Sequence, residues 1–353
     1  MTRRVVVIGG GENAEHDVSL ATATAVAGAL RSGGFDVDEL TIDRDGRWRR
    51  GTDAFGSRVA GSVAAALRVI ERTDVVFPAV HGPSGEDGTL AALCALTHTR
   101  MVGSGLRAGA LGMDKWVTKL VAEAVGIRTA PGRLVDAADV AGIGFETPVV
   151  VKPASCGSSF GVVLVRDASH LRAALRGAAR FDHRILIEDV VTGREIDVAI
   201  LREADGRRWA PPPLEIRTDG VFDTRSKYDG SARFRVPADI DRADRAALTG
   251  AALRMFDALG CAGVARIDFF LTADGPVLNE VNTMPGMTAE SQVPRMFAAA
   301  GLPYEQLVAR LVDAAAVPVR GGHAYAGDMP CCLGFSDARA DRGGRALPGR
   351  SGP

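Results

Sequence analysis

The chain has 353 residues, of which 46% are hydrophobic and 24% charged, and its formal net charge is −1. This length suffices for two or three domains with hydrophobic cores, and the composition is typical of a globular protein. A net charge near zero argues against a nucleic-acid or anionic-membrane partner, and no apolar stretch has membrane-spanning length. The five cysteines lack CxxC spacing, and the apolar run in MTRRVVVIGG is too short for a signal peptide. We therefore expect a cytoplasmic protein without a disulfide framework or a zinc site.

The first third of the chain alternates strands and helices. Such alternation is typical of a doubly wound parallel sheet, so residues 1–112 are predicted to form an α/β domain. The pattern predicts strands over 4–8, 35–42 and 74–80, and helices over 19–30 and 89–96.

GGGENA, from Gly9 to Ala14, follows the first predicted strand and precedes the first helix. It matches the loose G-x-G-x-x-A dinucleotide pattern, which makes an NAD-binding dehydrogenase the alternative from a different class of protein. Two features argue against it. The acid that ends the second strand, Asp43, lies too far along the chain, and Glu12 would face a pyrophosphate.

The middle of the chain, residues 113–195, is predicted to form a second domain around a Gly/Ser loop. In TPVVVKPASCGSSFGVVLV, two strands flank this loop, and Lys152 lies at its base. A loop rich in N–H and hydroxyl donors can cover a triphosphate, although an ordinary hairpin is the alternative. Helices are predicted over 115–124 and 169–180, and a strand over 184–191.

Residues 196–318 are predicted to form a third domain, and residues 319–353 a disordered tail that is rich in Gly, Arg and Pro. Its predicted elements are a strand over 194–201, a polar loop over 217–234, helices over 239–259 and 303–316, and a hairpin over 266–282.

The hairpin RIDFFLTADGPVLNEVN carries acids where apolar residues would pack better. Side chains alternate faces along a strand, so a register that sets Asp268 opposite Glu280 also sets Arg266 opposite Asn282. The same register pairs Leu271 with Val277 and leaves a five-residue loop. Adjacent carboxylates repel unless a proton or cation lies between them, and an all-oxygen set suits Mg²⁺. A solvated face balanced by Arg266 is the alternative.

Lysine is rare in this chain. Only four of the 42 basic residues are lysines: Lys115, Lys119, Lys152 and Lys227. They are therefore candidates for contacts that need a compact ammonium group, such as contacts with phosphate.

HGPSGEDG forms a loop at the end of a predicted strand and begins at His81. Ligands bind at this end of the strands in open α/β sheets, so we expect the loop to face a substrate.

Taken together, the motifs resemble those of D-alanine–D-alanine ligases, which belong to the ATP-grasp superfamily. The resemblance covers about residues 4 to 318 and implies an N-terminal doubly wound parallel-sheet domain followed by an ATP-grasp fold of two subdomains. The motifs occur in the family's order: AEHDVSL, HGPSGEDG, VGSG…MDKWVTK, VVVKPASCGSSFGV, ILIEDVVTGREIDVAIL, SKY, GVARIDFFLTADG and LNEVNTMPGMTAESQVPRM.

The resemblance implies an ATP-dependent ligase that joins two D-alanines through a D-alanyl phosphate, to supply peptidoglycan synthesis. It implies two Mg²⁺ ions, for which Mn²⁺ can substitute, held by Asp268, Glu280 and Asn282. The implied ATP-binding residues are Lys115, Lys152, Ser158, Ser159, Glu188, Val191, Glu195 and Lys227.

The amino-acid substrates are implied to bind at a separate set of residues. Glu15 and His81 would bind the first D-alanine, Ser291 would hold the carboxylate of the second, and Arg266 with the N–H of Gly286 would form an oxyanion hole. Glu15, Ser158 and Tyr228 resemble a hydrogen-bonded triad that ties the loops to the first substrate. The family also implies a homodimer. D-serine or D-lactate as the second substrate, in a resistance or natural-product pathway, and a catalytically dead binding protein remain open alternatives.

Overall fold

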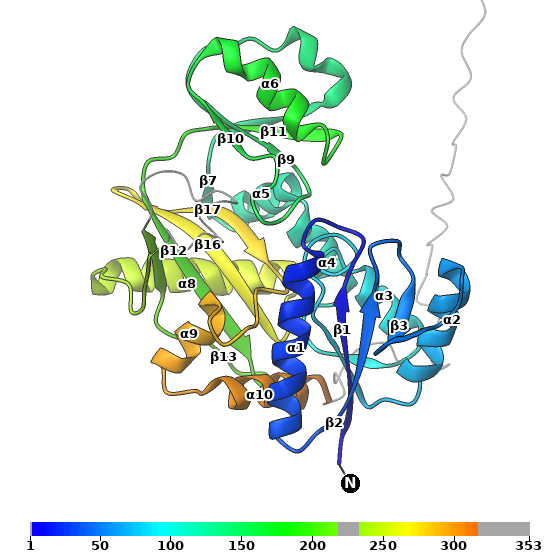
Figure 1. Cartoon of the computed structure of the whole chain (residues 1–353). Coiled ribbons are helices and arrows are strands. Elements are labelled where there is room, and N and C mark those ends of the chain that lie inside the picture. The colour runs from blue at the N-terminus through cyan, green and yellow to red at the C-terminus, as the bar shows by residue number, and fades with distance from the viewer. Residues whose placement is uncertain (1, 218–232, 317–353) are drawn as a thin grey trace, which may run out of the picture. The chain divides into compact units, whose positions relative to one another are not determined.

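The structure is a computed structural model that describes residues 2–217 and 233–316 (Figure 1). Four predictions fall wholly or mostly outside these residues: those for Lys227 and Tyr228, that of a polar loop over 217–234, and that of a disordered tail over 319–353. Residues 1–317 cluster into one unit by their contacts. No helix in the described ranges is long and apolar enough to cross a membrane.

The N-terminal sheet is doubly wound, as predicted. Its strand order is β4-β3-β2-β1-β5-β6, and β1, β2, β5 and β6 run parallel. The residues of β1 from Val5 to Gly10 are all buried, because helices cover both faces of the sheet. The strands are β1 (Arg4–Gly10), β2 (Asp36–Ile42), β3 (Trp48–Arg50), β4 (Asp53–Ala54), β5 (Val75–Pro78) and β6 (Arg100–Met101); the helices are α1 (His16–Ser32), α2 (Val59–Ile70) and α3 (Thr89–Leu96).

The middle sheet has four strands in the order β10-β9-β11-β8, all antiparallel to their neighbours. The predicted Gly/Ser loop connects β9 to β10, which pair with each other. α4 (Leu106–Met113) and α5 (Lys115–Ala124) lead into this region. Its elements are β8 (Gly132–Asp136), the 3₁₀ helix η1 (Ala137–Gly142), β9 (Val149–Pro153), β10 (Val163–Val165), α6 (Ala168–Ala178) and β11 (Arg184–Asp189).

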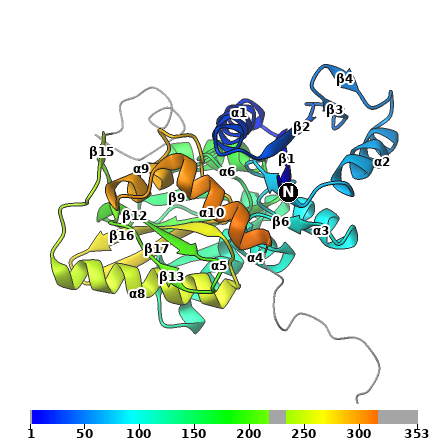
Figure 2. The same ribbon diagram turned by 90° about the horizontal axis from the view of Figure 1, so that it is seen from below.

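The third sheet has seven strands in the order β15-β14-β12-β16-β17-β7, with β13 paired to β12. Figures 1 and 2 show β12, β16 and β17 side by side in this sheet. α8 packs against it and buries Leu248, Met255 and Phe256. The elements are β7 (Arg128–Thr129), β12 (Arg194–Arg202), β13 (Arg208–Trp209), β14 (Leu214–Arg217), β15 (Arg233–Arg235), α8 (Arg242–Leu259), β16 (Val264–Thr272), β17 (Gly275–Asn282), α9 (Gln292–Ala299) and α10 (Tyr304–Ala316).

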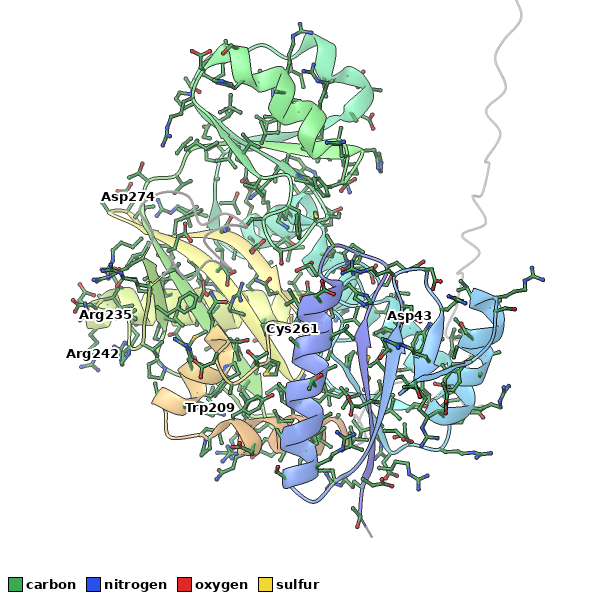
Figure 3. The ribbon with its side chains drawn as sticks, in the orientation of Figure 1. Asp43, Trp209, Arg235, Arg242, Cys261 and Asp274 are labelled. Carbon is green, nitrogen blue, oxygen red and sulfur yellow. The ribbon has the colours of Figure 1, made fainter. Side chains whose placement is uncertain are left out.

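The β16–β17 hairpin confirms one half of the predicted register and corrects the other. Asp268 lies opposite Glu280 and Arg266 opposite Asn282, as predicted. The pairing then shifts by one residue, so Leu271 lies opposite Pro276 and not Val277. Asn279 is the extra residue of a β-bulge, and this bulge shortens the turn to two residues with Asp274 at its tip (Figure 3).

Other differences from the prediction lie at element ends and in short elements. α1 begins at His16, three residues before the predicted start, and α8 begins after Asp241, whose carboxylate caps the helix by accepting from Asp244 N. The sequence analysis did not predict α2, α4, α9 or the 3₁₀ helix η1, nor the strands β3, β4, β7, β8, β13 and β15, of which β15 begins inside the predicted polar loop. Segments of two or three residues are too short to show a period, which explains why the shortest strands were missed, whereas α2 and α9 are amphipathic and carry a helical signal that the sequence analysis did not use.

The core beneath the third sheet yields a stability prediction. Leu248 in α8 is 0% exposed, and Leu96 at the end of α3 is 80% exposed. Leu248→Ala should lower the free energy of unfolding by about 2 to 5 kcal/mol, because it leaves a cavity. Leu96→Ala removes the same atoms from water and should change it by less than about 0.5 kcal/mol. Urea denaturation of both variants tests this, and equal effects would contradict the packing described.

Candidate active site

Two cavities meet at one buried side chain. The larger, of about 420 Å³, lies between the middle sheet and the third sheet and includes residues of β9, β11, β12, β16 and β17. The smaller, of about 260 Å³, includes residues of the loop before α1, the loop after β5 and the N-terminus of α9. Arg266 lines both, and the Gly/Ser loop contributes Ser159 to the larger and Ser158 to the smaller.

The predicted site residues divide between these cavities according to their predicted roles. Those predicted for the amino-acid substrates line the smaller cavity: Glu15, His81, Ser158, Gly286 and Ser291. The predicted metal ligands straddle the junction, with Asp268 and Glu280 in the larger cavity and Asn282 in the smaller. Most residues predicted for ATP line the larger cavity: Lys115, Lys152, Ser159, Glu188, Val191 and Glu195. Ser158, which was also predicted for ATP, lines the smaller cavity, and Lys227 lies outside the described residues.

Arg266 is held by hydrogen bonds to two neighbours. Its Nε and one terminal nitrogen donate to the two oxygens of Asp268, both at 2.7 Å, and its other terminal nitrogen donates to Gln292 Oε1 at 2.6 Å. Bidentate pairing fixes the plane of a guanidinium. Burial lowers the pKa of Arg266, but the carboxylates of Asp268 and Asp197 outweigh it and raise the pKa overall. Arg266 is therefore a fixed positive charge between the cavities.

Asp197, which the sequence analysis did not identify, is the second acid at this arginine. It lies on β12 directly opposite Asp268 and is only 2% exposed. Its Oδ2 is 3.4 Å from Arg266 Nε and has no hydrogen bond within the described ranges. Burial, and then the neighbouring charge of Asp268, raise the pKa of Asp197 well above its usual value. An acid interrupts the apolar run REIDVAIL just as Asp268 interrupts its own strand, so the same signal was present.

The oxygen atoms at the junction fit a Mg²⁺ ion. Asp268 and Glu280 face each other across the hairpin, and Asn282 Nδ2 donates to Asp268 Oδ2 at 3.0 Å, which leaves its amide oxygen as an acceptor. Lys115 Nζ lies 3.4 Å from Glu280 Oε2. No group of three or more His, Cys, Asp or Glu suited to a metal occurs in residues 2–217 and 233–316. Mg²⁺ typically needs only one or two carboxylates beside phosphate oxygens and water.

Two lysines enter the larger cavity from different elements. Lys115 is the first residue of α5, whose N-cap Asp114 accepts from Val117 N, and its Nζ donates to Cys156 O at 2.7 Å. Lys152 lies on β9, and its Nζ is 2.6 Å from Glu188 Oε2. Lys115 thus contacts the Gly/Ser loop, while Lys152 contacts the adjacent strand β11.

The carboxylate of Glu188 is shared by two ammonium groups. Lys119 Nζ lies 2.7 Å from Glu188 Oε1, opposite the contact of Lys152 with Oε2. Burial raises the pKa of Glu188, but the two lysines outweigh this effect and lower the pKa overall. The sequence analysis named Glu188 only as an implied ATP-binding residue, and the structure shows that its side chain pairs with both lysines.

The Gly/Ser loop is fastened to α1 through Glu15. Ser158 Oγ donates to Glu15 Oε1, and Ser158 and Ser159 have φ angles of 47° and 58°, which non-glycine residues rarely adopt. A Cβ on Gly82 or on Gly157 would lie 2.4 Å from Glu15 Oε2. A Cβ at either position would therefore displace the carboxylate of Glu15, and Gly82 also has a φ of 71°, which L side chains rarely adopt.

His81 lines the smaller cavity with both ring nitrogens in contact with protein. Nε2 lies 2.9 Å from Thr22 Oγ1, and Nδ1 lies 3.1 Å from Met284 O and 3.6 Å from Glu86 Oε1. Burial lowers its pKa, but Glu86 and Glu15 outweigh burial and raise it overall. The sequence analysis quoted Glu86 within HGPSGEDG without giving it a role, and the structure places this carboxylate in the cavity wall.

The far wall of the smaller cavity is the N-terminus of α9. Ser291 is its N-cap residue, and Ser291 Oγ lies 2.8 Å from Thr288 Oγ1. Gly286 is adjacent, since a Cβ there would lie 3.1 Å from Ser291 Oγ. The N–H groups at a helix N-terminus favour a carboxylate.

The residues of the GGGENA segment, and the acid after β2, contact other parts of the protein and are not arranged as in a dinucleotide-binding site. Asp43, the acid after β2, pairs with Arg49 at 2.9 Å (Figure 3). The Glu12 side chain packs against Gly46, and Asn13 donates to the carbonyls of His81 and Pro83. This loop therefore positions Glu15 and the HGPSGEDG loop.

Comparison with solved structures defines the class of protein. A D-Ala:D-Ser ligase from Enterococcus faecalis is 30% identical, with a TM-score of 0.75, covering 89% of this chain and 100% of that one. A D-alanine–D-alanine ligase from Bacillus anthracis, solved with ATP, is 25% identical, with a TM-score of 0.73, covering 89% and 97%. The fold is the ATP-grasp fold of an ATP-dependent ligase.

Sequence comparison defines the family. Residues 4–104 match the D-ala D-ala ligase N-terminus and residues 136–313 the D-ala D-ala ligase C-terminus. D-alanine–D-alanine ligase of Mycobacterium sp. (strain KMS) is 39% identical over 359 aligned residues, covering 88% of this chain and 96% of the relative. That of Mycolicibacterium smegmatis is 38% identical, covering 88% and 95%. The chain belongs to the D-alanine–D-alanine ligase family, which favours a ligase over the NAD-binding alternative.

The pairing of Glu188 gives a pH prediction. Its pKa is lowered from 4.5 in the folded state, so its stabilising contribution is complete above 4.5 and is lost as the pH falls through the folded value. Glu188→Gln lacks this contribution. The difference in unfolding free energy between the wild type and Glu188→Gln should be largest near neutral pH and should shrink below 4.5. Denaturation at several pH values measures it, and a difference that grows on acidification would contradict the pairing.

Proposed function

We propose that the protein joins D-alanine to a second D-alanine, using ATP to activate the first carboxylate as an acyl phosphate. The observation that carries this proposal is the division of charged groups between two cavities that meet at Arg266. One cavity has the size and lysines for a nucleotide, and the other has acids for ammonium groups. A carboxylate of the first substrate at the junction would lie between the phosphate donor and the amine.

The larger cavity suits the nucleotide. Residues 188–191 would hold the adenine edge through the backbone and Glu195 the ribose, while Lys115, Lys152 and Lys227 would neutralise the phosphates. Phosphoryl transfer depends mainly on such positioning and charge neutralisation. Two Mg²⁺ ions, held by Asp268, Glu280 and Asn282, would supply the remaining positive charge, and Mn²⁺ would substitute for them.

The smaller cavity suits two amino acids. Glu15, assisted by His81, would bind the ammonium of the first, and Ser291 at the N-terminus of α9 would hold the carboxylate of the second. The attack of the amine creates a negatively charged oxygen, and Arg266 with the Gly286 N–H would stabilise it. Tyr228 would join Ser158 and Glu15 to close the loop over the first substrate.

The remaining aspects of the proposal follow from the same reaction. We propose the division into residues 1–112, 113–195 and 196–318, which the three sheets support, except that β7 and the start of β12, both within 113–195, pair in the third sheet. The enzyme would act as a homodimer in the cytoplasm, where ATP is available, and its dipeptide would be used for peptidoglycan and hence for cell-wall biogenesis and cell shape.

Phosphate release from ATP and Mg²⁺, measured with a panel of D- and L-amino acids and D-lactate, tests the proposal. We expect release that requires D-alanine. Asp268→Asn and Glu280→Gln should each lower turnover about 100-fold or more, because they remove charge from the metal-binding face without changing its shape. Asp274→Asn, at the exposed tip of the same hairpin, is the matched control and should retain full activity. Normal turnover in the first two variants would exclude this site, and release without any acceptor would favour another function.

The acceptor can be predicted separately. D-alanine must lose a proton before it attacks, so its site should bind the carboxylate without placing a cation beside the amine. Neutral Tyr228 fits that need, and we expect D-alanine to outcompete D-lactate at pH 7 and above. D-serine should be the second-best acceptor, in line with the similarity to a D-Ala:D-Ser ligase.

Product analysis at equal concentrations of D-alanine, D-serine and D-lactate measures this preference. Tyr228→Phe should lower activity, because the loop would lose the hydrogen bonds of the hydroxyl. A depsipeptide as the main product at neutral pH would contradict the predicted acceptor but not the ATP-dependent reaction.

A further inference from the structure

Lys119 is a buried cation that the proposed reaction does not use. It lies one turn after Lys115 on α5 and is 4% exposed. Its Nζ donates to the carbonyl of Ala130 and to Glu188 Oε1. Lys152 and Glu188 line the larger cavity, whereas Lys119 lies outside its lining. Lys119 therefore contacts the wall of the cavity only indirectly, through the carboxylate of Glu188 and the carbonyl of Ala130.

The three side chains form a buried cluster whose charges do not cancel. Lys119, Glu188 and Lys152 are 4%, 6% and 5% exposed, and each oxygen of the carboxylate contacts one ammonium, at 2.7 and 2.6 Å. Two ammonium groups and one carboxylate give a net charge of about +1 at neutral pH. Without Lys119, the pair of Lys152 and Glu188 would be neutral.

A buried neutral pair and a buried cationic cluster act differently on a phosphate. Charge interactions in a site shielded from water are stronger than at the surface, so one unit of charge matters there. The carboxylate of Glu188 fixes the position of Lys152, but it also cancels the field of Lys152. Lys119 offsets that cancellation while the positional restraint is kept.

We propose that Lys119 is a positioning residue that shares the charge of Glu188, so that Lys152 keeps a net positive charge for the phosphates of the nucleotide. This inference rests on the proposed binding of ATP in the larger cavity. It gives Lys119 a specific effect: affinity for the phosphates and not for the adenosine part. A residue that only tied α5 to Ala130 would affect both parts alike.

The test is nucleotide binding by the full-length protein without amino-acid substrate. Dissociation constants of adenosine, ADP and a non-hydrolysable ATP analogue are measured by calorimetry or competition for the wild type and Lys119→Met, which is similar in length but uncharged. The ratio of analogue affinity to adenosine affinity should fall about tenfold in the variant, with ADP intermediate and adenosine within about twofold of the wild type. An equal loss for all three ligands, or no loss, would overturn the inference.

A charge-balanced variant separates charge from packing. Lys119→Met combined with Glu188→Gln leaves Lys152 as the only charge of the cluster and restores its net charge to that of the wild type. The affinity ratio should therefore return to within about threefold of the wild-type value, the non-additivity expected of coupled charges. A double variant that keeps the tenfold deficit would overturn the charge argument. Thermal unfolding checks that each variant is folded, and if Lys119→Met is not, Lys119→Gln replaces it in both comparisons with the same expected ratios.

The wild-type measurement separates this inference from the function on which it rests. If the wild type binds neither adenosine nor the ATP analogue, the proposed nucleotide site is wrong, and the inference falls with it. If the wild type binds the analogue more tightly than adenosine but Lys119→Met keeps the same ratio, the inference alone is overturned.

Discussion

The site depends on one buried ion cluster, in which Arg266 pairs with Asp268 and Asp197. The two acids lie opposite each other on neighbouring strands, so without the guanidinium they would place two negative charges in contact inside the protein. Removing one partner from such a buried cluster leaves an uncompensated charge, and this costs much more stability than the intact pair contributes. The same guanidinium forms part of the wall of both cavities, so the stability of the sheet and the chemistry of the junction depend on one side chain.

Around this cluster, two further acids pair with neighbouring lysines or hold a loop in place by hydrogen bonds. Glu188 holds two lysines on one side of the larger cavity, and Glu15 holds the Gly/Ser loop on the side of the smaller. Each acid therefore has a mechanical role besides its electrostatic one. Strained φ angles at Ser158 and Ser159 persist because the surrounding contacts fix them, which is a common property of functional loops.

Local signals in the sequence predicted the parallel N-terminal sheet and the polar face of the β16–β17 hairpin, whereas the ATP-grasp fold and most of the candidate site residues were implied only by the resemblance to the ligase family. Acids within an apolar strand identified Asp268 and Glu280, and the structure places them face to face. Asp197 carried the same signal, but its partner lies on a strand about 70 residues away, and its pairing depends on sheet order, which periodicity does not give. Lys119 was found only as a rare residue type, since its contact with Glu188 is a product of tertiary packing. The bulge at Asn279 was missed because an ideal register fits the sequence equally well.

The bulge at Asn279 reverses the alternation of side chains between the two faces of β17. Leu278 lies opposite Phe269 and is buried in the core, whereas Glu280, two residues later, lies opposite Asp268 on the cavity side. In a regular strand, residues two apart share a face. The extra residue therefore allows one continuous segment to build core at its start and a polar site at its end. Loss of that single residue would exchange the two faces along part of the strand, so the spacing between Leu278 and Glu280 is as much a determinant of this site as the identity of the acids.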